Sequence, residues 1–367
     1  MTNSPARRLL LLGGATAAVA VSAVLVSQAY ASGAAQWTIT PAADIGKGYE
    51  YQSVAAIGDD DVWAVGSLSS DDPNTTMAAH WDGKAWNQTP TPEGWDLDGV
   101  SGSAGDDVWA VGRGAKGSVT AHWDGKSWGN VDPGKPELPS GETAGLYAVD
   151  TADNGQAWAG GCGDSDTAST AFMQHWDGGA WTPSALPIPQ GVDNSCVFAV
   201  KYVSDTEVWA LGSTWQKSPW MLRWDGQKWN TETTPSNADN VQLTGLMTGA
   251  GDGLPGMCAS GYTLDKNMKP HPYLMCRDGD KWTQVDAPKI DAFISSIGSD
   301  GAGGAYLTGR TFQNKPVLLH YDGTTVTQED APSAKDGSLA DIDSAPGSKR
   351  VWVVGAEGSD GFAAHSG

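Results

Sequence analysis

Short apolar stretches alternate with tight polar turns along nearly the whole chain, and this alternation is periodic. The phrase "DDVWAVGS" at residues 60–67 returns in six further versions, the most degenerate being "LPGMCASG". Its central position is held by Trp63, Trp109, Trp158, Trp209, Cys258, Tyr306 and Trp352, with spacings of 46, 49, 51, 49, 48 and 46 residues. The chain therefore contains seven units of one repeat.

Each unit predicts four short strands. An apolar strand such as "YQSVAAI" is followed by an acidic turn, the strand "VWAVG" and a polar loop of variable length. A third strand such as "MAAHWD" ends in an Asp-Gly turn, which is typical of hairpins, and a fourth runs from a Trp to "TP" or "AP". Four antiparallel strands in every ~45–50 residues are typical of propeller blades. We therefore predict an all-β, seven-bladed β-propeller.

The two ends of the chain complement each other. The seventh unit stops at "FAAHSG", after its third strand, whereas "QWTITPAA" at residues 36–43 matches the fourth strand of the other units. We predict that this N-terminal strand completes the last blade, because closure of the ring removes open sheet edges. The repeats predict a single domain over residues 32–367.

Residues 1–31 have the features of a secretory signal peptide. Arg7 and Arg8 precede an apolar run, which ends at the small residues Ala29 and Ala31 of a cleavage site. We expect cleavage after Ala31 and a secreted, extracellular protein without membrane attachment; an uncleaved anchor is the alternative. Both Sec and twin-arginine export are compatible with this segment.

The charge balance excludes two classes of partner. The chain has 43 Asp and Glu against 22 Lys and Arg, a formal charge of −21. Nucleic acid and anionic membranes both require basic patches, so neither is expected as a partner. We expect a monomer whose partner is a glycan or an extracellular protein.

The fifth unit indicates a structural role for the histidines that recur in the repeat. Five of the six histidines share one third-strand position, but here Cys258 and Cys276 replace both the Trp and the His of the repeat. A disulfide requires neighbouring Cβ atoms, so we predict that these cysteines are bonded and that Trp and His face each other elsewhere. The expected structural pairs are Trp63 with His80, Trp109 with His122, and Trp158 with His175.

Residues at the same position of separate blades cannot converge on one ion, so we expect neither a metal site nor a catalytic role for these histidines. Cys162 and Cys196 remain, in loops expected on the same face of neighbouring blades. An exported chain favours disulfides, and we predict that these two form the second one. Free thiols are the alternative.

The repeated "VWAVG…HWDG…W" pattern resembles secreted bacterial proteins built from such units. It is also similar to the tectonin family of propeller lectins, whose repeats carry aromatic-Asp-Gly-x-x-Trp hairpins. The resemblance covers nearly all of the chain after residue 31. It implies a propeller and a lectin-like, carbohydrate-binding role, and it implies no catalytic residue.

Three tryptophans fall outside the repeat: Trp95, Trp215 and Trp220. All three are expected at or near the face that carries the inter-blade loops and the loops between second and third strands. Exposed Trp rings beside acids such as Asp96 and Asp98 suit sugar binding, since the rings cover CH groups and the acids take hydroxyls. The alternative is that these residues pack their own loops.

The sequence contains few features that indicate a cofactor or catalytic residues. His271, in "MKPHPY", is the one histidine outside the shared position, and it is expected in a long loop on the same face. It is therefore a ligand-binding candidate and the one histidine to test for catalysis. No cofactor is expected, although oxygen-rich loops such as "SSDDPNT" leave calcium as an alternative. GxSxG, HExxH and phosphate-loop motifs are missing. Asp98, Glu142 and Asp341 are the acids expected near the channel mouth.

We therefore expect a secreted module that binds carbohydrate or a partner protein through one loop face of the propeller. The alternative is an extracellular polysaccharide hydrolase or lyase with its acids at the channel mouth.

Overall fold

The computed structural model describes residues 35–43, 48–68, 77–92, 95–214, 219–235, 241–249, 256–333 and 335–367. The expected signal peptide, residues 1–31, lies outside this part. None of the described residues belongs to a helix that is long and apolar enough to span a bilayer.

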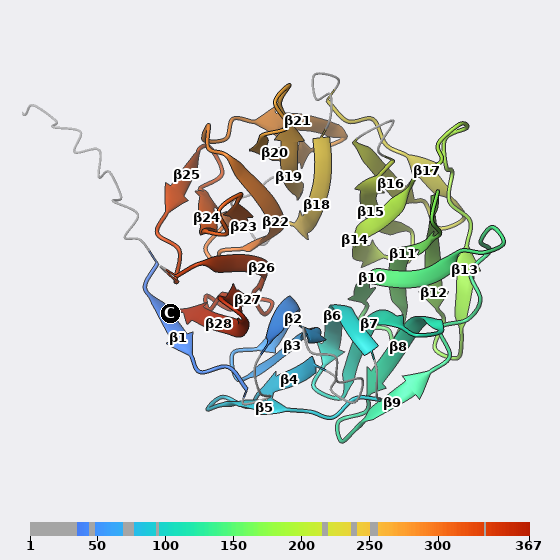
Figure 1. Ribbon diagram of the computed structural model, residues 1–367, viewed down its shortest axis with the longest axis horizontal. Coiled ribbons are helices and arrows are strands. Elements are labelled where there is room, and N and C mark those ends of the chain that lie inside the picture. Colours follow the sequence, from blue (N-terminus) through green and yellow to red (C-terminus); the bar gives the residue numbers. More distant parts are fainter. Residues whose placement is uncertain are drawn as a thin grey trace, which may run out of the picture. The chain divides into compact units, whose positions relative to one another are not determined.

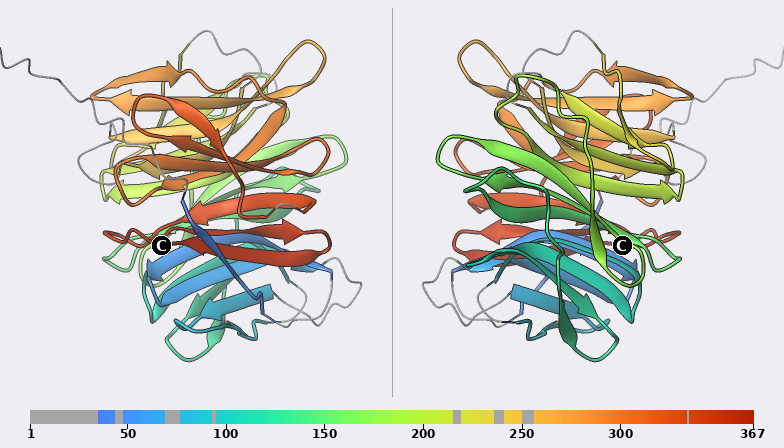
Figure 2. Two further views of the ribbon diagram at one scale, coloured as in Figure 1. Left: turned by 90° about the vertical axis from the view of Figure 1, so that its left-hand side faces the viewer. Right: turned by 90° about the vertical axis from the view of Figure 1, so that its right-hand side faces the viewer.

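Residues 35–367 form seven four-stranded antiparallel sheets, arranged as blades around a central channel (Figure 1). In six of them the strands follow the order of the chain from the channel outward. The two side views show that loops connect the strands on both faces of the ring (Figure 2). The predicted all-β seven-bladed propeller is thus confirmed.

The strands have the following bounds. The innermost strands are β2 (Tyr49–Gly58), β6 (Trp95–Ala104), β10 (Thr143–Thr151), β14 (Cys196–Ser204), β18 (Val241–Thr248), β22 (Ala292–Ser299) and β26 (Gly337–Asp343). The second strands are β3 (Asp61–Leu68), β7 (Asp107–Gly114), β11 (Ala157–Asp164), β15 (Glu207–Ser213), β19 (Met257–Leu264), β23 (Ala305–Thr311) and β27 (Trp352–Glu357). The third strands are β4 (Met77–Trp81), β8 (Gly117–Trp123), β12 (Ser169–Trp176), β16 (Trp220–Trp224), β20 (Pro270–Asp278), β24 (Pro316–Tyr321) and β28 (Asp360–Ser366). The outermost strands are β5 (Trp86–Gln88), β9 (Trp128–Val131), β13 (Trp181–Ser184), β17 (Trp229–Thr231), β21 (Lys281–Val285), β25 (Val326–Glu329) and β1 (Trp37–Thr40).

The N-terminal strand closes the ring. β1 pairs with β28 as the outermost strand of the seventh blade, with Trp37 opposite Ser366 and Thr40 opposite Ala363. Thr40 also accepts a hydrogen bond from Trp86 Nε1 of the first blade. The predicted closure is confirmed, and the same strand links the last blade to the first.

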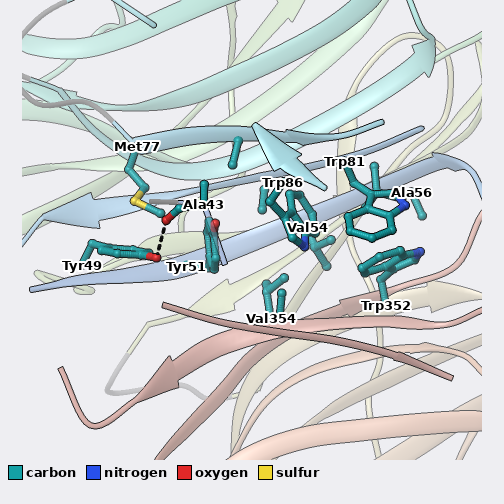
Figure 3. Packing of buried hydrophobic residues seen from close by; sticks show 14 of the residues in the cluster. Ala43, Tyr49, Tyr51, Val54, Ala56, Met77, Trp81, Trp86, Trp352 and Val354 are labelled. Atoms are coloured by element: carbon teal, nitrogen blue, oxygen red, sulfur yellow. Dashed lines mark hydrogen bonds between the residues drawn. The ribbon is translucent and has the colours of Figure 1, made fainter. Parts of the chain in front are cut away.

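Tryptophans of the repeat join neighbouring blades. Trp352 of the seventh blade packs against Trp81 and Trp86 of the first, with ring centroids 5.1 and 5.5 Å apart (Figure 3). Trp63 packs in the same way against Trp123 and Trp128 of the second blade. The spacing of the repeat thus places each second-strand Trp between its own sheet and the hairpin of the next.

The "WDG" hairpins are closed by the aspartate. Asp82 Oδ1 accepts hydrogen bonds from the backbone N–H groups of Lys84 and Ala85, both at 3.0 Å. Gly83 has φ +85°, a conformation that other residues rarely adopt. The conserved spacing of Asp, Gly and Trp therefore reflects the geometry of one turn.

Both predicted disulfides are present. Cys258 and Cys276 lie directly opposite each other on β19 and β20 and are bonded. Cys162 of β11 is bonded to Cys196, the first residue of β14, so this bridge joins the third blade to the fourth. No free cysteine remains among the described residues.

Candidate functional site

The repeated tryptophans lie opposite the shared histidine position. Trp63 and His80 are cross-strand partners whose rings stack with centroids 4.3 Å apart. Arg223 takes the histidine position in the fourth blade, with its guanidinium 5.5 Å from the Trp209 ring centroid. The pairing recurs for Trp109 with His122, Trp158 with His175, Tyr306 with His320 and Trp352 with His365. Each pair belongs to its own sheet, so the histidines do not come together at one site.

A side chain that begins or precedes the second strand orients the histidine in several blades. His80 Nε2 lies 2.8 Å from Asp61 Oδ1, which also accepts a hydrogen bond from Trp63 Nε1. Equivalent hydrogen bonds join His122 to Asp107, His175 to Gln156 and His320 to Asp300. Sequence reasoning missed these partners because it assigned the acids of "DDVW" to turns. The signal for Asp61, Asp107 and Gln156 was their position two residues before the Trp, whereas Asp300 lies six residues before Tyr306 and does not follow this spacing.

His80→Ala is expected to lower the free energy of unfolding by about 1 kcal/mol, since it removes one ring stack and one half-buried hydrogen bond. Urea denaturation checks this value. Zinc should leave the midpoint of the wild-type protein unchanged. A zinc-dependent rise that disappears in His80→Ala would instead show that the histidine is a ligand.

The candidate residues Trp95, Asp96 and Asp98 lie on a strand of the second blade and not in a loop. β6 begins at Trp95, because "WDLD" pairs with the end of β7: Trp95 lies opposite Gly114 and Asp96 opposite Arg113. Asp96 is exposed, whereas Asp98 lines the central channel. The side chain of Trp95 lies outside the described part.

Of the other two tryptophans outside the repeat, only Trp220 lies in the described part. Trp215 lies outside the described residues. Trp220 is only 2% exposed and packs in a cluster with Trp158, Val197 and Leu222. The expectation that Trp220 meets a ligand is therefore wrong: as the first residue of β16 it faces Gly212 and fills space inside the blade.

His271 lies in strand β20, whereas the sequence placed it in a long loop. It is half-buried, and its Nδ1 lies 3.1 Å from the carbonyl oxygen of Ile290, just before the sixth blade. Its ring nitrogens are 3.8 Å from carboxylate oxygens of Asp265 and Asp291. His271 thus connects the fifth blade to the segment that starts the sixth.

A central channel of about 840 Å³ is lined by all seven innermost strands. Each of these strands has a register shift at the same place, which leaves one residue without a direct partner on the second strand. These bulge residues all line the channel, and they are Gln52, Asp98, Tyr147, Phe198, Thr244, Ser295 and Ala340. We call this set the bulge ring.

Some acids of the channel accept hydrogen bonds that join neighbouring blades. Asp341 Oδ2 accepts hydrogen bonds from Ser53 Oγ and the Val54 backbone N–H, both at 2.9 Å, and its Oδ1 accepts one from Ser296 Oγ at 2.6 Å. Burial raises the pKa of Asp341. Asp341 therefore contacts three blades at once, which leaves it poorly suited to the acid role that the enzyme alternative gave it.

Asp150 and Asp343 have similar positions. Asp150 accepts hydrogen bonds from the Tyr202 backbone N–H and from Lys201 Nζ, at 2.7 and 3.2 Å. Asp343 accepts one from the Ala56 backbone N–H, and burial raises its pKa to about 6. These carboxylates link the third blade to the fourth and the seventh to the first.

The two other acids that the sequence singled out differ in position. Asp98 is in the bulge ring, and its buried Oδ2 has no hydrogen-bond partner within the described residues. Burial raises the pKa of Asp98 to about 6. Glu142 is not among the channel-lining residues; its Oε1 accepts a hydrogen bond from Thr170 Oγ1 at 2.9 Å.

A surface that the sequence did not reveal lies over the fifth and sixth blades. The Phe293 ring contacts Tyr262 and Phe312, with centroids 5.1 and 4.9 Å apart and edge-on geometry, and Arg310 lies 5.5 Å over it. Phe312 is 53% exposed. Met268, 64% exposed, is at the tip of the neighbouring β19–β20 turn. We call Tyr262, Met268, Phe293, Arg310 and Phe312 the blade 5–6 patch.

Across the described ranges, no group of three or more His, Cys, Asp or Glu side chains is arranged to hold a metal ion. The loop "SSDDPNT", from which calcium was considered, lies outside these ranges. Calcium therefore stays an untested alternative.

No family model matches the chain, and no curated protein matches it. Solved structures are similar in fold. They include YCF48 from Cyanidioschyzon merolae, with a TM-score of 0.59, 15% identity, and coverage of 91% of this chain and 98% of that one. The WD40 propeller domain of Doa1 has a TM-score of 0.59, 14% identity, and coverage of 90% and 97%. Virginiamycin B lyase from Staphylococcus aureus, with quinupristin, has a TM-score of 0.61, 14% identity, and coverage of 90% and 99%. At these identities the likeness supports the propeller fold alone.

Proposed function

We propose that the protein is an exported binding module that holds a partner protein on the blade 5–6 patch. The observation that carries this proposal is the blade 5–6 patch: Met268 and Phe312 are exposed, the other two aromatic rings are half-buried, and Arg310 lies over one of them, on a strongly acidic protein. Aromatic residues, Met and Arg are the types enriched at protein interfaces. A similar fold has also been solved as YCF48 bound to D1 peptide, which shows that one such propeller binds a peptide.

Met268 gives the proposal a second support. It has φ +62° at the fourth position of a five-residue turn, where the equivalent turn of the next blade has Asn314 at φ +53°. The left-handed conformation costs more free energy for Met than for Asn or Gly. The Met268 side chain is exposed, so it adds no packing in the free protein that would offset this cost. A strained, exposed, apolar residue on the turn next to the aromatic rings of the patch is what a binding surface would retain.

Extracellular location is part of the proposal. Two disulfides are compatible with an oxidising compartment, and the predicted signal peptide supplies the route. Carbohydrate is the other ligand class. Support for it comes from Trp95 and Trp215, whose side chains lie outside the described part, so the partner protein is the better supported ligand.

Met268→Asn is expected to raise the free energy of unfolding by about 0.5–1 kcal/mol and to weaken partner binding, because it relieves turn strain and removes an apolar contact. Thermal unfolding measures the first effect. For the second, peptides selected from a displayed library on the wild-type protein are titrated against Met268→Asn and Phe312→Ser. We expect at least a tenfold loss of affinity in each variant.

The matched control is Ile39→Ser, which removes an apolar side chain that is 55% exposed on β1 of the seventh blade. It should leave peptide affinity unchanged. Equal affinity of all variants would refute the patch as the binding surface. A glycan array in parallel covers the other ligand: binding to glycans, with no peptide selected, would replace the partner protein by carbohydrate.

A further inference from the structure

The bulge ring has one charged member. Its seven residues occupy equivalent positions, and six of them are neutral: Gln52, Tyr147, Phe198, Thr244, Ser295 and Ala340. Asp98 is the exception. The sheets do not need a carboxylate at this position, because six of the seven blades make the same bulge without one. The fold therefore does not explain why this position of the second blade holds an aspartate.

Asp98 is also the channel acid with a buried carboxylate oxygen that has no hydrogen-bond partner in the described part. Asp150, Asp341 and Asp343 accept hydrogen bonds from neighbouring blades, whereas Asp98 accepts none from the described residues, and its Oδ2 is buried. Arg113 lowers the pKa of Asp98 through its charge, but within the described part the two do not approach to ion-pair distance. A half-buried carboxylate with one buried, unpartnered oxygen carries a desolvation cost, so a ligand that donates a hydrogen bond to that oxygen lowers the cost.

The neighbours of Asp98 in the ring define an apolar side of the same site. Tyr147 and Phe198, on the third and fourth blades, have ring centroids 6.1 Å apart. The guanidinium of Arg113 lies 5.4 Å over the Tyr147 ring, which shows that this ring already attracts a cation on one side. The arc from Asp98 to Phe198 thus offers a carboxylate followed by two aromatic rings.

The rest of the channel favours positive charge as well. Its lining includes five aspartates, Asp98, Asp150, Asp153, Asp341 and Asp343, and a single lysine, Lys201. Lys201 is paired with Asp150 at 3.2 Å, so its charge is compensated. A channel lined mostly by one sign of charge concentrates ligands of the other sign.

We infer that the arc Asp98–Tyr147–Phe198 is a binding site for an organic cation, an ammonium group attached to an apolar or aromatic group. The ammonium donates to Asp98, and the apolar part packs on Tyr147 and Phe198. The site lies in the channel and is separate from the blade 5–6 patch, so it does not depend on the proposed partner protein.

Benzylammonium is a suitable probe, and benzyl alcohol has nearly the same shape without the charge. We expect wild-type protein to bind benzylammonium about tenfold more tightly than benzyl alcohol at pH 7.5, measured by NMR titration. In Asp98→Asn this preference should disappear. Asp96→Asn is the matched control, because it removes an exposed carboxylate two residues away on the same strand, and it should retain most of the preference.

A pH series on the wild-type protein and on Asp98→Asn tests the site further. With a pKa of about 6, Asp98 is charged at pH 7.5 and mostly protonated at pH 5, so benzylammonium should bind several-fold more weakly at pH 5. Asp96, Arg113 and Tyr147 are the charged and titratable groups around it, and burial raises the pKa of Tyr147 to about 12. Asp343 lines the same channel and has a pKa of about 6 as well, so the loss of affinity at pH 5 must be much smaller in Asp98→Asn than in wild type. Equal affinity for the two probes, or a preference that survives in Asp98→Asn, would overturn the inference.

Discussion

A chain that begins at Gly48 is expected to lose roughly 3–5 kcal/mol of folding free energy relative to one that begins at Ala35. The shorter chain lacks β1, and with it four residues of pairing with β28 and the packing of Trp37 against Tyr306, at 5.7 Å between centroids. Trp86 Nε1 also loses Thr40, its hydrogen-bond partner across the junction of the first and seventh blades. Thermal unfolding followed by circular dichroism measures the difference.

The same truncation should also change the association state. Without β1, the third strand β28 becomes the edge of the seventh blade and presents unpaired backbone groups. We expect oligomers in size-exclusion chromatography of the shorter chain. The chain that begins at Ala35 keeps every described contact of β1 and serves as the control. Equal midpoints and equal elution of the two chains would show that β1 does not hold the ring closed.

Asp341→Ala is expected to destabilise the protein by about 2–3 kcal/mol at pH 7.5. The change leaves the Val54 N–H and the hydroxyls of Ser53 and Ser296 without their acceptor, at a junction of three blades. Burial raises the pKa of Asp341, so the carboxylate itself carries a desolvation cost, and its removal offsets part of the loss. Guanidinium denaturation gives the value.

Asp98→Asn is the internal comparison for this measurement. Both acids line the channel, but the carboxylate of Asp98 accepts no hydrogen bond from the described residues. We expect Asp98→Asn to change the free energy of unfolding by less than about 0.5 kcal/mol or to stabilise the protein. If the two variants lose equal stability, the loss comes from charge in the channel and not from the hydrogen bonds of Asp341.

The sequence was sufficient for the architecture because the signals that define it are local and repeated. Period and strand length predicted seven blades, and "QWTITPAA" predicted the closing strand. The exchange of a Trp and a His for Cys258 and Cys276 predicted a cross-strand register, and the two residues are direct partners. The packing of each Trp onto the next blade was not predictable in this way, since nothing in one unit shows which tryptophans of its neighbour it meets.

The site was less accessible to sequence reasoning, for two physical reasons. A bulge shifts the pairing by a single residue, so the alternation of a strand such as "WDLDGVSGSA" does not show that Asp98 is the unpaired position. Exposure depends on neighbouring elements: Trp220 follows a polar loop in the sequence and is nevertheless buried, whereas Phe312 in "TGRTFQNK" is exposed.

The pairing of β1 with β28 also predicts an order of folding. The Thr40 hydroxyl donates to the carbonyl of Ala363, 323 residues along the chain, so the seventh blade is complete only when the C-terminus is available. The sheets of the first six blades are each built from one short stretch of chain, and we expect such local contacts to form before long-range ones. We therefore expect ring closure by β1 to come last in folding, after an open arc of blades has formed.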